Sequence, residues 1–190
     1  KDLGAKNLGQ DLPILLKNQM SVVATSDAGN GVGYTGFRIR GSAGTSINVM
    51  LNGVPYNDSE SQGTFFVNIP DMASSASQIV IQRGVGTSSN GTASFGASVN
   101  ILTKNPDEKP YVLGQFSAGS FNTMKTSFEA GTGKFLNNLL SVSARYSTIN
   151  SDGYIDRAFS KLNSYNINAL FEKGNTKLRF LAFGGKEKTY

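Results

Sequence analysis

The side chains that most often carry out chemistry in proteins are either missing from this sequence or scattered along it. Its 190 residues include no His and no Cys, which removes the commonest general base, the usual zinc ligands and every Ser–His or Cys–His pair. The 13 acidic residues are spread along the chain, so no carboxylate cage for a metal ion and no catalytic carboxylate pair stands out. We therefore expect no enzyme activity, no cofactor and no metal site.

Two glycine-rich segments have the composition of a phosphate-binding loop without its sequence. Residues 29–33 read Gly-Asn-Gly-Val-Gly, and residues 84–91 begin Gly-Val-Gly-Thr. Neither segment ends in the Gly-Lys-Ser/Thr of a P-loop, and neither has a third Gly at the spacing of a dinucleotide-binding turn before a helix. Both segments are interpreted as turns.

The positive net charge does not indicate a nucleic-acid partner. The chain carries 18 basic residues and a formal charge of +5, but no stretch gathers basic and aromatic side chains into a patch. No apolar run approaches the ~18 residues that a membrane-spanning helix needs. If the protein belongs to a membrane, it must therefore enter it as a barrel.

The first half of the chain predicts a small α+β domain. The spacing of Leu8, Leu12, Leu15 and Leu16 predicts a helix over residues 8–18. Runs of strand length follow at 21–25, 36–40, 47–51, 78–82 and 98–103, and residues 70–77 predict one further short helix. A charged, proline-bracketed segment at 105–110 predicts the boundary between a domain of residues 1–105 and a second one of residues 106–190.

The second half of the chain has a strict alternation of apolar and polar residues. Strands are predicted at 111–119, 123–131, 139–148, 162–173 and 176–184. Strands of about ten residues with an apolar and a polar face are typical of an outer-membrane barrel. An antiparallel sandwich with one wet face has the same alternation, so periodicity alone leaves both possibilities open.

Four sequence blocks in the first half of the chain favour the barrel over the sandwich, because together they resemble a known family. They are Phe37-Arg38-Ile39-Arg40-Gly41, Leu51-Asn52-Gly53-Val54, Gln82-Arg83-Gly84, and Ser94-Phe95-Gly96 leading into Val99-Asn100-Ile101. In order and spacing these blocks resemble the plug domain of TonB-dependent outer-membrane receptors over residues 8–104. The resemblance implies an α+β plug domain followed by antiparallel strands of a large (about 22-stranded) transmembrane β-barrel, of which this chain contains about five.

The resemblance also implies a function. Receptors of this kind sit in the outer membrane of Gram-negative bacteria and bind a scarce extracellular solute, most often an iron chelate. They import it with energy from an inner-membrane motor, delivered by a TonB-type energy-coupling protein. The expected partners are therefore that protein, the solute and outer-membrane lipid. The alternatives are an importer of oligosaccharides or peptides paired with a surface lipoprotein, and a non-transporting, soluble β-rich binding module.

Two sets of site residues follow from the resemblance. Arg40 and Arg83 stand where the family's arginines hold the plug against acidic groups of the barrel wall, and Glu129 is a possible acidic partner. Guanidinium groups suit this role because they form directional, bidentate bonds with carboxylates. The solute is expected on the loops at residues 27–34 and 56–66, where the candidate ligand-binding residues are Asn30, Tyr34, Tyr56, Asn57, Gln62 and Phe66.

Overall fold

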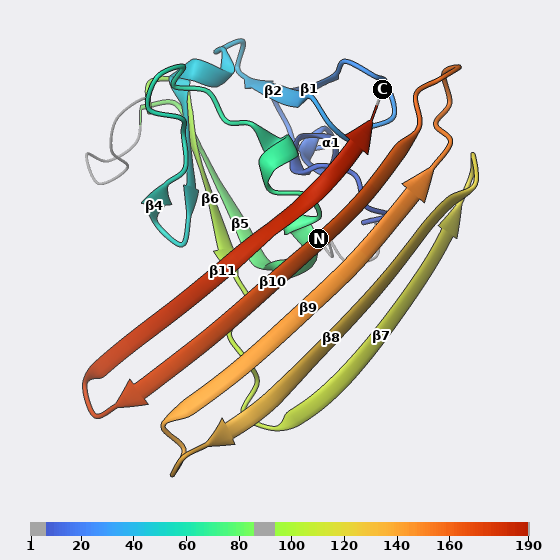
Figure 1. Cartoon of the computed structure of the whole chain (residues 1–190). Coiled ribbons are helices and arrows are strands. Elements are labelled where there is room, and N and C mark those ends of the chain that lie inside the picture. The colour runs from blue at the N-terminus through green and yellow to red at the C-terminus, as the bar shows by residue number, and fades with distance from the viewer. Residues whose placement is uncertain (1–6, 86–93, 190) are drawn as a thin grey trace. The chain divides into compact units, whose positions relative to one another are not determined.

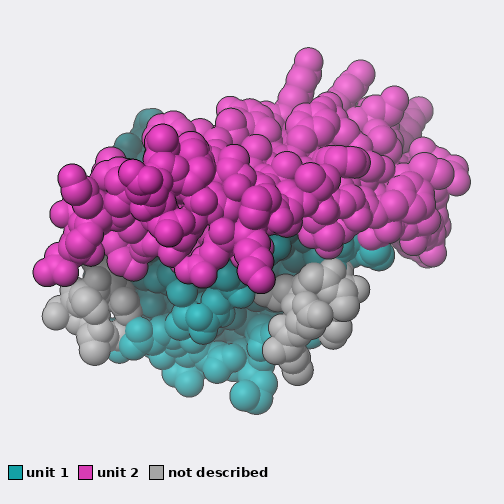
Figure 2. Space-filling view, turned by 90° about the horizontal axis from the view of Figure 1, so that it is seen from below, with its two compact units in different colours: residues 1–104 teal, residues 105–190 magenta. Residues whose placement is uncertain are grey.

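The computed structural model describes residues 7–85 and 94–189 of the chain. The chain divides into two compact units, residues 1–104 and residues 105–190, which Figure 2 distinguishes by colour. The helices and strands of the first unit are α1 (Leu12–Leu16), β1 (Val22–Ser26), β2 (Thr35–Ile39), η2 (Gly44–Ser46), β3 (Ile47–Leu51), β4 (Val54–Pro55), η3 (Phe66–Asn68), α2 (Met72–Ser75), β5 (Ala76–Arg83) and β6 (Ala97–Thr103). Those of the second unit are β7 (Pro110–Gly119), β8 (Thr123–Phe135), β9 (Leu140–Ser151), β10 (Ser160–Lys173) and β11 (Thr176–Thr189).

The first unit is built on a mixed four-stranded sheet with the strand order β4-β3-β6-β5, beside a two-stranded hairpin of β1 and β2. Every residue of β3 is buried, and β3 runs parallel to β6. A central parallel strand is covered on both faces, so a mainly apolar run suits this position better than an alternating one; Asn48 is the one polar residue of β3 and is buried as well. The core is made of β-branched side chains that are almost fully buried: Ile39, Ile47, Val49, Val99 and Ile101. The expected α+β architecture is confirmed.

The helix predicted over residues 8–18 is shorter than expected. It begins after Asp11, with Pro13 in its first turn, and ends at Leu16. Before it, Asn7 closes a turn by accepting a hydrogen bond from the Gly9 amide (2.9 Å), and Gly9 has a φ of +104°. Leu8 is consequently 37% exposed and does not join the apolar face. The prediction was wrong for residues 8–11 because a side-chain-closed turn takes precedence there over helical periodicity.

The second unit is a five-stranded antiparallel sheet with the order β11-β10-β9-β8-β7 (Figure 1). All five strands predicted from the alternation are present, and β8, β9 and β11 extend further than expected, with β11 reaching Thr189. Each strand pairs with its sequence neighbour, so the register places alternate residues of all five strands on a common face.

The exposed face of this sheet is the apolar one. It carries large hydrophobic side chains that are 40–73% exposed: Val112, Phe116, Met124, Phe128, Tyr146, Tyr165, Ile167, Leu178 and Phe180. The opposite face carries the polar residues Lys125, Ser127, Arg145, Ser147 and Ser164, together with the apolar residues Ile149 and Leu162. Large apolar side chains on one face and mainly polar side chains on the other are the alternation expected of strands in an outer-membrane barrel. Among the helices in the described ranges, none is long and apolar enough to cross a membrane.

Candidate functional site

The two loops expected to bind a solute come together in the first unit and form a cavity of about 250 Å³. We call it the loop cavity. The described residues that line it come from the β1–β2 hairpin and from the segment leading into η3: Thr25, Asp27, Gly33, Tyr34, Thr35, Gly36, Thr64, Phe65, Phe66 and Val67. Hydroxyl groups, a carboxylate and aromatic rings thus share one concave surface. A polar chelate or a sugar would find directional hydrogen-bonding partners and stacking surfaces there.

Two aromatic side chains give the loop cavity its accessible apolar surface. Tyr34 is 63% exposed and Phe65 is 43% exposed. Phe66 also lines the cavity, but it is buried and packs against Phe37 with ring centroids 5.5 Å apart. Phe65 has an extended backbone (φ −94°, ψ 98°), so neighbouring side chains point in different directions. Phe66 was among the expected ligand-binding residues and Phe65 was not, although alternation across the Phe65-Phe66 pair could have indicated that one of them faces the solvent.

The loop at residues 56–66 is held in shape by Asn57. Its amide oxygen accepts a hydrogen bond from the Val49 amide (2.7 Å), and its amide nitrogen donates to the carbonyls of Ile47 (2.9 Å) and Gln62 (2.7 Å). Side chains that satisfy backbone groups in this way fix the path of a loop. Asn57 thus joins the loop to the central strand β3, and its polar atoms are engaged with the backbone.

The tip of the same loop is a compact turn built around Asp58. Its carboxylate accepts hydrogen bonds from the Glu60 amide (3.1 Å), the Ser61 amide (2.7 Å) and the Ser61 hydroxyl (2.9 Å). These bonds favour the ionised form and lower the pKa of Asp58. Gln62 follows with a φ of +57° and an exposed side chain. Tyr56 precedes the turn, half-buried, and its burial raises the pKa of the phenol.

The other loop, residues 27–34, is closed by backbone and side-chain bonds. The Asp27 amide donates to the Tyr34 carbonyl (3.1 Å), and the Asn30 side chain accepts from the Val32 amide (3.1 Å). Tyr34 therefore leaves a structured hairpin and reaches the loop cavity, while Asn30 shapes the turn. Of the six candidate ligand-binding residues, Tyr34 and Phe66 line the loop cavity, whereas the other four are not among its described lining residues.

A buried carboxylate lies beneath this hairpin. Asp11, at the start of α1, is only 3% exposed. It accepts a hydrogen bond from the Thr35 hydroxyl (2.8 Å), and the Gly33 amide also donates to it. Its second oxygen, Oδ1, is buried without a hydrogen-bonding partner among the described residues. Burial raises the pKa of Asp11 to about 6, despite the opposing effect of these hydrogen bonds. Asp11 was not among the site residues expected from the sequence.

The two motif arginines lie at one corner of the first unit. A Cβ atom placed on Gly84 would lie 3.6 Å from Nη1 of Arg40, so the Arg40 guanidinium group reaches the turn that directly follows Arg83. Gly84 has a φ of +84°, and its amide donates to the Gly96 carbonyl (2.7 Å). A Cβ atom on Gly96 would overlap the side chain of Ser42. Glycine is therefore required at both positions.

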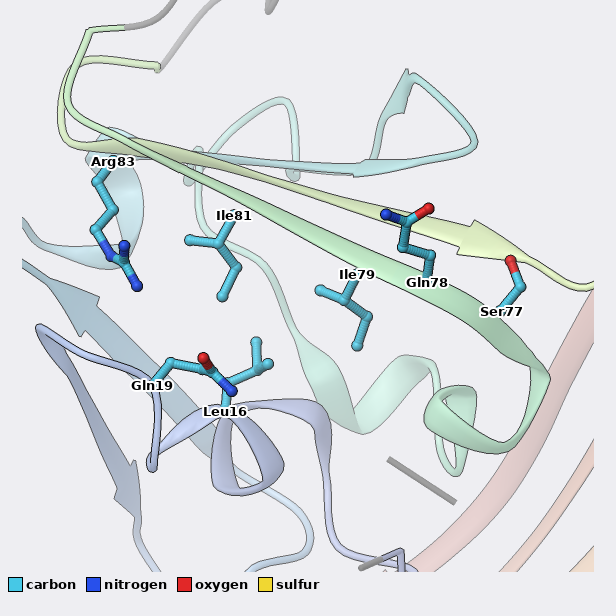
Figure 3. A pocket seen from close by; sticks show the side chains of 7 residues that line it. All are labelled: Leu16, Gln19, Ser77, Gln78, Ile79, Ile81 and Arg83. Carbon is cyan, nitrogen blue, oxygen red and sulfur yellow. The ribbon is translucent and has the colours of Figure 1, made fainter. Parts of the chain in front are cut away.

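Arg83 also borders a second cavity, of about 510 Å³, between α1 and β5 (Figure 3). Leu16, Ile79 and Ile81 form its apolar lining, and Gln19, Ser77, Gln78 and Arg83 contribute polar groups. The Arg83 Nε atom donates to the carbonyl of Met20 (3.1 Å). Within the described part of the first unit, neither Arg40 nor Arg83 forms an ion pair with a carboxylate. Both guanidinium groups thus keep donors available for an acidic partner.

Glu129, the third residue of the expected plug-holding set, lies on β8 in the second unit. Its carboxylate accepts a short hydrogen bond from the Tyr111 hydroxyl (2.6 Å). The ring of Tyr111 lies over Gly131, where any Cβ atom would overlap it. Glu129 also stands directly opposite Arg145 in the β8–β9 register. Charged and polar groups are thus grouped on this face of the sheet. The described residues include no group of three or more acidic, His or Cys side chains that could hold a metal ion.

Comparison with known proteins agrees with this architecture. The pyoverdine outer membrane receptor FpvA from Pseudomonas aeruginosa PAO1 is similar over 92% of this chain and 25% of its own, with a TM-score of 0.72 and 14% identity. The copper transporter OprC is similar over 94% of this chain and 29% of its own (TM-score 0.75, 16% identity). The FrpB iron transporter from Neisseria meningitidis is similar over 95% and 30% (TM-score 0.74, 15% identity).

These relatives establish the fold, and the chain spans between a quarter and a third of their length. A search of curated protein sequences finds no match. The family model of the TonB-dependent receptor plug domain matches residues 1–98, which is more than half of the 190 residues. The chain therefore belongs to the TonB-dependent receptors, a family of proteins in the outer membrane of Gram-negative bacteria, and contains their plug domain followed by antiparallel strands of the barrel.

Proposed function

We propose that the full-length protein binds an iron chelate outside the cell and imports it with energy delivered by a TonB-type coupling protein. In this proposal residues 1–105 are the plug domain and residues 106–190 are the first strands of the barrel wall. The observation that carries the proposal is the match of residues 1–98 to the plug family, followed by a sheet whose exposed face is apolar. A plug inside a transmembrane barrel is an arrangement for gated passage rather than for catalysis.

The loop cavity is the proposed plug contribution to the solute site. Tyr34 and Phe65 offer exposed aromatic surface, while Asp27 and Thr64 offer polar groups beside them. A cavity of about 250 Å³ is smaller than most complete ligand sites, so it would hold only one part of a solute. Barrel loops would supply the rest. An iron chelate is the favoured cargo because several similar structures bear the names of siderophore or iron receptors, whereas one is named as a copper transporter.

The arginine corner is proposed to hold the plug in the barrel. Arg40 and the Arg83-Gly84 turn come together and have no carboxylate partner within the described part of their own unit. Acidic groups of the barrel wall, including Glu129, would complete the ion pairs. Removing one partner of a buried ion pair leaves an uncompensated charge. Variants with Gln at positions 40 and 83 should therefore release the plug more readily under denaturant.

The test is uptake of radiolabelled ferric siderophores by cells that carry the full-length receptor. We expect uptake that stops when the proton-motive force is collapsed and is reduced at least tenfold in a Tyr34→Ala/Phe65→Ala double variant. Met20→Ala is the matched control, because Met20 is 76% exposed and lies outside the residues that line the loop cavity.

Different results would favour other functions. Uptake that survives collapse of the proton-motive force would contradict energy coupling and favour a passive pore. Energy-dependent uptake of an oligosaccharide, with no uptake of any ferric siderophore, would contradict the cargo and favour the importer that works with a surface lipoprotein. A receptor that is found in the soluble fraction would contradict the whole proposal.

A further inference from the structure

The exposed face of β8–β11 is ordered in rows that run across the strands. One row consists of Phe128, Tyr146, Tyr165 and Gly184, which stand directly opposite one another in the successive registers. Gly184 leaves room for Tyr165, because a Cβ atom there would lie 2.9 Å from the tyrosine hydroxyl. A row of amphipathic aromatic rings suits the boundary between the apolar band of a barrel and the lipid headgroups.

Above this aromatic row the same face becomes polar and positively charged on β10 and β11, whereas β7 and β8 carry Phe116 and Met124 in the corresponding rows. The next row holds Asn163 opposite Lys186, and the row beyond it holds Lys161 opposite Lys188. All three lysines are exposed, and none of them forms an ion pair within the described ranges. Like charges directly opposite each other destabilise a sheet. The pair of Lys161 and Lys188 therefore indicates an external anion that would offset the repulsion.

The lysines are placed at the edge of an uncharged band. Between Asn163 and Lys173, the residues of β10 on the exposed face are Tyr165, Ile167, Ala169 and Phe171. At about 3.3 Å per residue and a strand tilt of about 40°, this stretch spans about 25 Å along a barrel axis, which is the height of the apolar band of an outer-membrane barrel. The lysine side chains therefore reach the level of the lipid headgroups.

The lysine end of the sheet is the extracellular end. The connections there are residues 120–122 and 152–159, whereas those at the other end are residues 136–139 and 174–175. Outer-membrane barrels have short periplasmic turns and longer extracellular loops, so the eight-residue connection marks the outside. Two nearby carboxylates are directed elsewhere: Glu187 lies on the opposite face of β11, and Asp152 accepts a hydrogen bond from Asn122 (2.7 Å).

We propose that Lys161, Lys186 and Lys188 form a binding site for the phosphate groups of a phosphorylated lipid in the outer leaflet. Tyr146 and Tyr165 would contact the lipid at the base of its headgroup, and the apolar band would contact its acyl chains. Ammonium groups attract phosphate as compact point charges. The inference rests on the proposed placement of the sheet in the barrel wall, but it is independent of the cargo and of energy coupling.

The test is binding of diphosphoryl lipid A to the full-length receptor in a neutral detergent, measured by native mass spectrometry over a lipid titration. Each lysine near an anionic membrane surface contributes about fivefold to binding, so the Lys161→Gln/Lys186→Gln/Lys188→Gln variant should bind about 100-fold more weakly. Lys173→Gln is the matched control, because it removes a lysine from the same face at the other end of β10 and should stay within twofold of the wild type. Lipid A without its phosphates should bind the wild type as weakly as diphosphoryl lipid A binds the triple variant.

Three outcomes would overturn the proposal. The triple variant could bind diphosphoryl lipid A as tightly as the wild type, or Lys173→Gln could weaken binding equally. Inorganic pyrophosphate could also bind as tightly as the lipid, which would make the site one for free anions. Every variant must retain the difference in gel mobility between boiled and unboiled samples, so that loss of binding is not loss of the barrel. Siderophore uptake is measured separately, so failure of the lipid site leaves the proposed transport function to its own test.

Discussion

Replacing Asp11 by Asn should make the plug domain more stable at neutral pH. Asp11 has an ordinary pKa of 3.8, and burial raises its pKa to about 6 in the folded plug. Below pH 3.8 the carboxyl group is protonated in both the folded and the unfolded chain, and above about 6 it is ionised in both. Between these values only the folded chain retains the proton, so the free energy of unfolding falls as the pH rises.

The size of this effect follows from the two pKa values. A difference of about 2 pKa units corresponds to about 3 kcal/mol at 1.36 kcal/mol per unit. The free energy of unfolding has decreased by this full amount by about pH 7. Asn cannot ionise, yet its oxygen can still accept the bond that the Thr35 hydroxyl donates to Asp11. Asp11→Asn should therefore match the wild type at pH 4 and exceed its free energy of unfolding by up to about 3 kcal/mol at pH 8.

The assay is urea unfolding of the plug in the full-length receptor between pH 4 and pH 8. A fluorophore on Ser59→Cys, in the exposed turn of the loop at residues 56–66, reports on the plug; residues 1–190 have no other Cys, and any Cys elsewhere in the receptor is replaced by Ser. Asp27→Asn is the control, because it makes the same change in charge at an exposed carboxylate. Parallel pH profiles for the wild type and Asp11→Asn would refute the argument that burial of this carboxylate destabilises the plug.

Further predictions concern single contacts. Asn57→Ala removes three hydrogen bonds to backbone groups and should lower the free energy of unfolding of the plug by about 2 kcal/mol. The measurement is the urea midpoint. The control is Asn68→Ala, which replaces an exposed asparagine and should leave the midpoint almost unchanged. Gly131→Ala should displace the Tyr111 ring and reduce the yield of folded, heat-modifiable barrel, whereas Gly114→Ala should not, since its Cβ would make an ordinary 3.7 Å contact. Equal yields from the two glycine variants would contradict the packing described for Tyr111.

The sequence was most informative where the physics is local or periodic. The mainly apolar run Ile47–Leu51, in which Asn48 is the one polar residue, predicted β3 with its observed bounds, because a strand buried on both faces needs no polar alternation. The period of two after residue 110 predicted the five strands of the second unit, because neighbouring side chains must face opposite sides of a sheet. Three glycines of the motif blocks, Gly41, Gly53 and Gly84, have positive φ angles, which glycine adopts without steric cost.

The remaining features depend on contacts between distant residues. The first helix is short partly because the Asn7 side chain binds Asp71 and Ser74, which are more than 60 positions away. Asn57 and Tyr34 looked equivalent as loop residues, but one bonds to the backbone of β3 and the other reaches the loop cavity. Hydrogen-bonding residues in a loop have the same composition whether they bind a ligand or the chain itself, so only the path of the backbone separates these roles.

The central claim is that residues 110–189 form barrel strands whose exposed apolar face contacts lipid. The most direct test is cysteine scanning of residues 163–170 in the full-length receptor, in outer membranes, with a membrane-impermeant maleimide and a lipid-soluble one. We predict a period of two. Cysteines at Tyr165, Ile167 and Ala169 should react only with the lipid-soluble reagent. Cysteines at Ser164, Asn166 and Asn168 should show no preference for the lipid-soluble reagent. Reaction of all these positions with the impermeant reagent, or the opposite phase, would contradict the account.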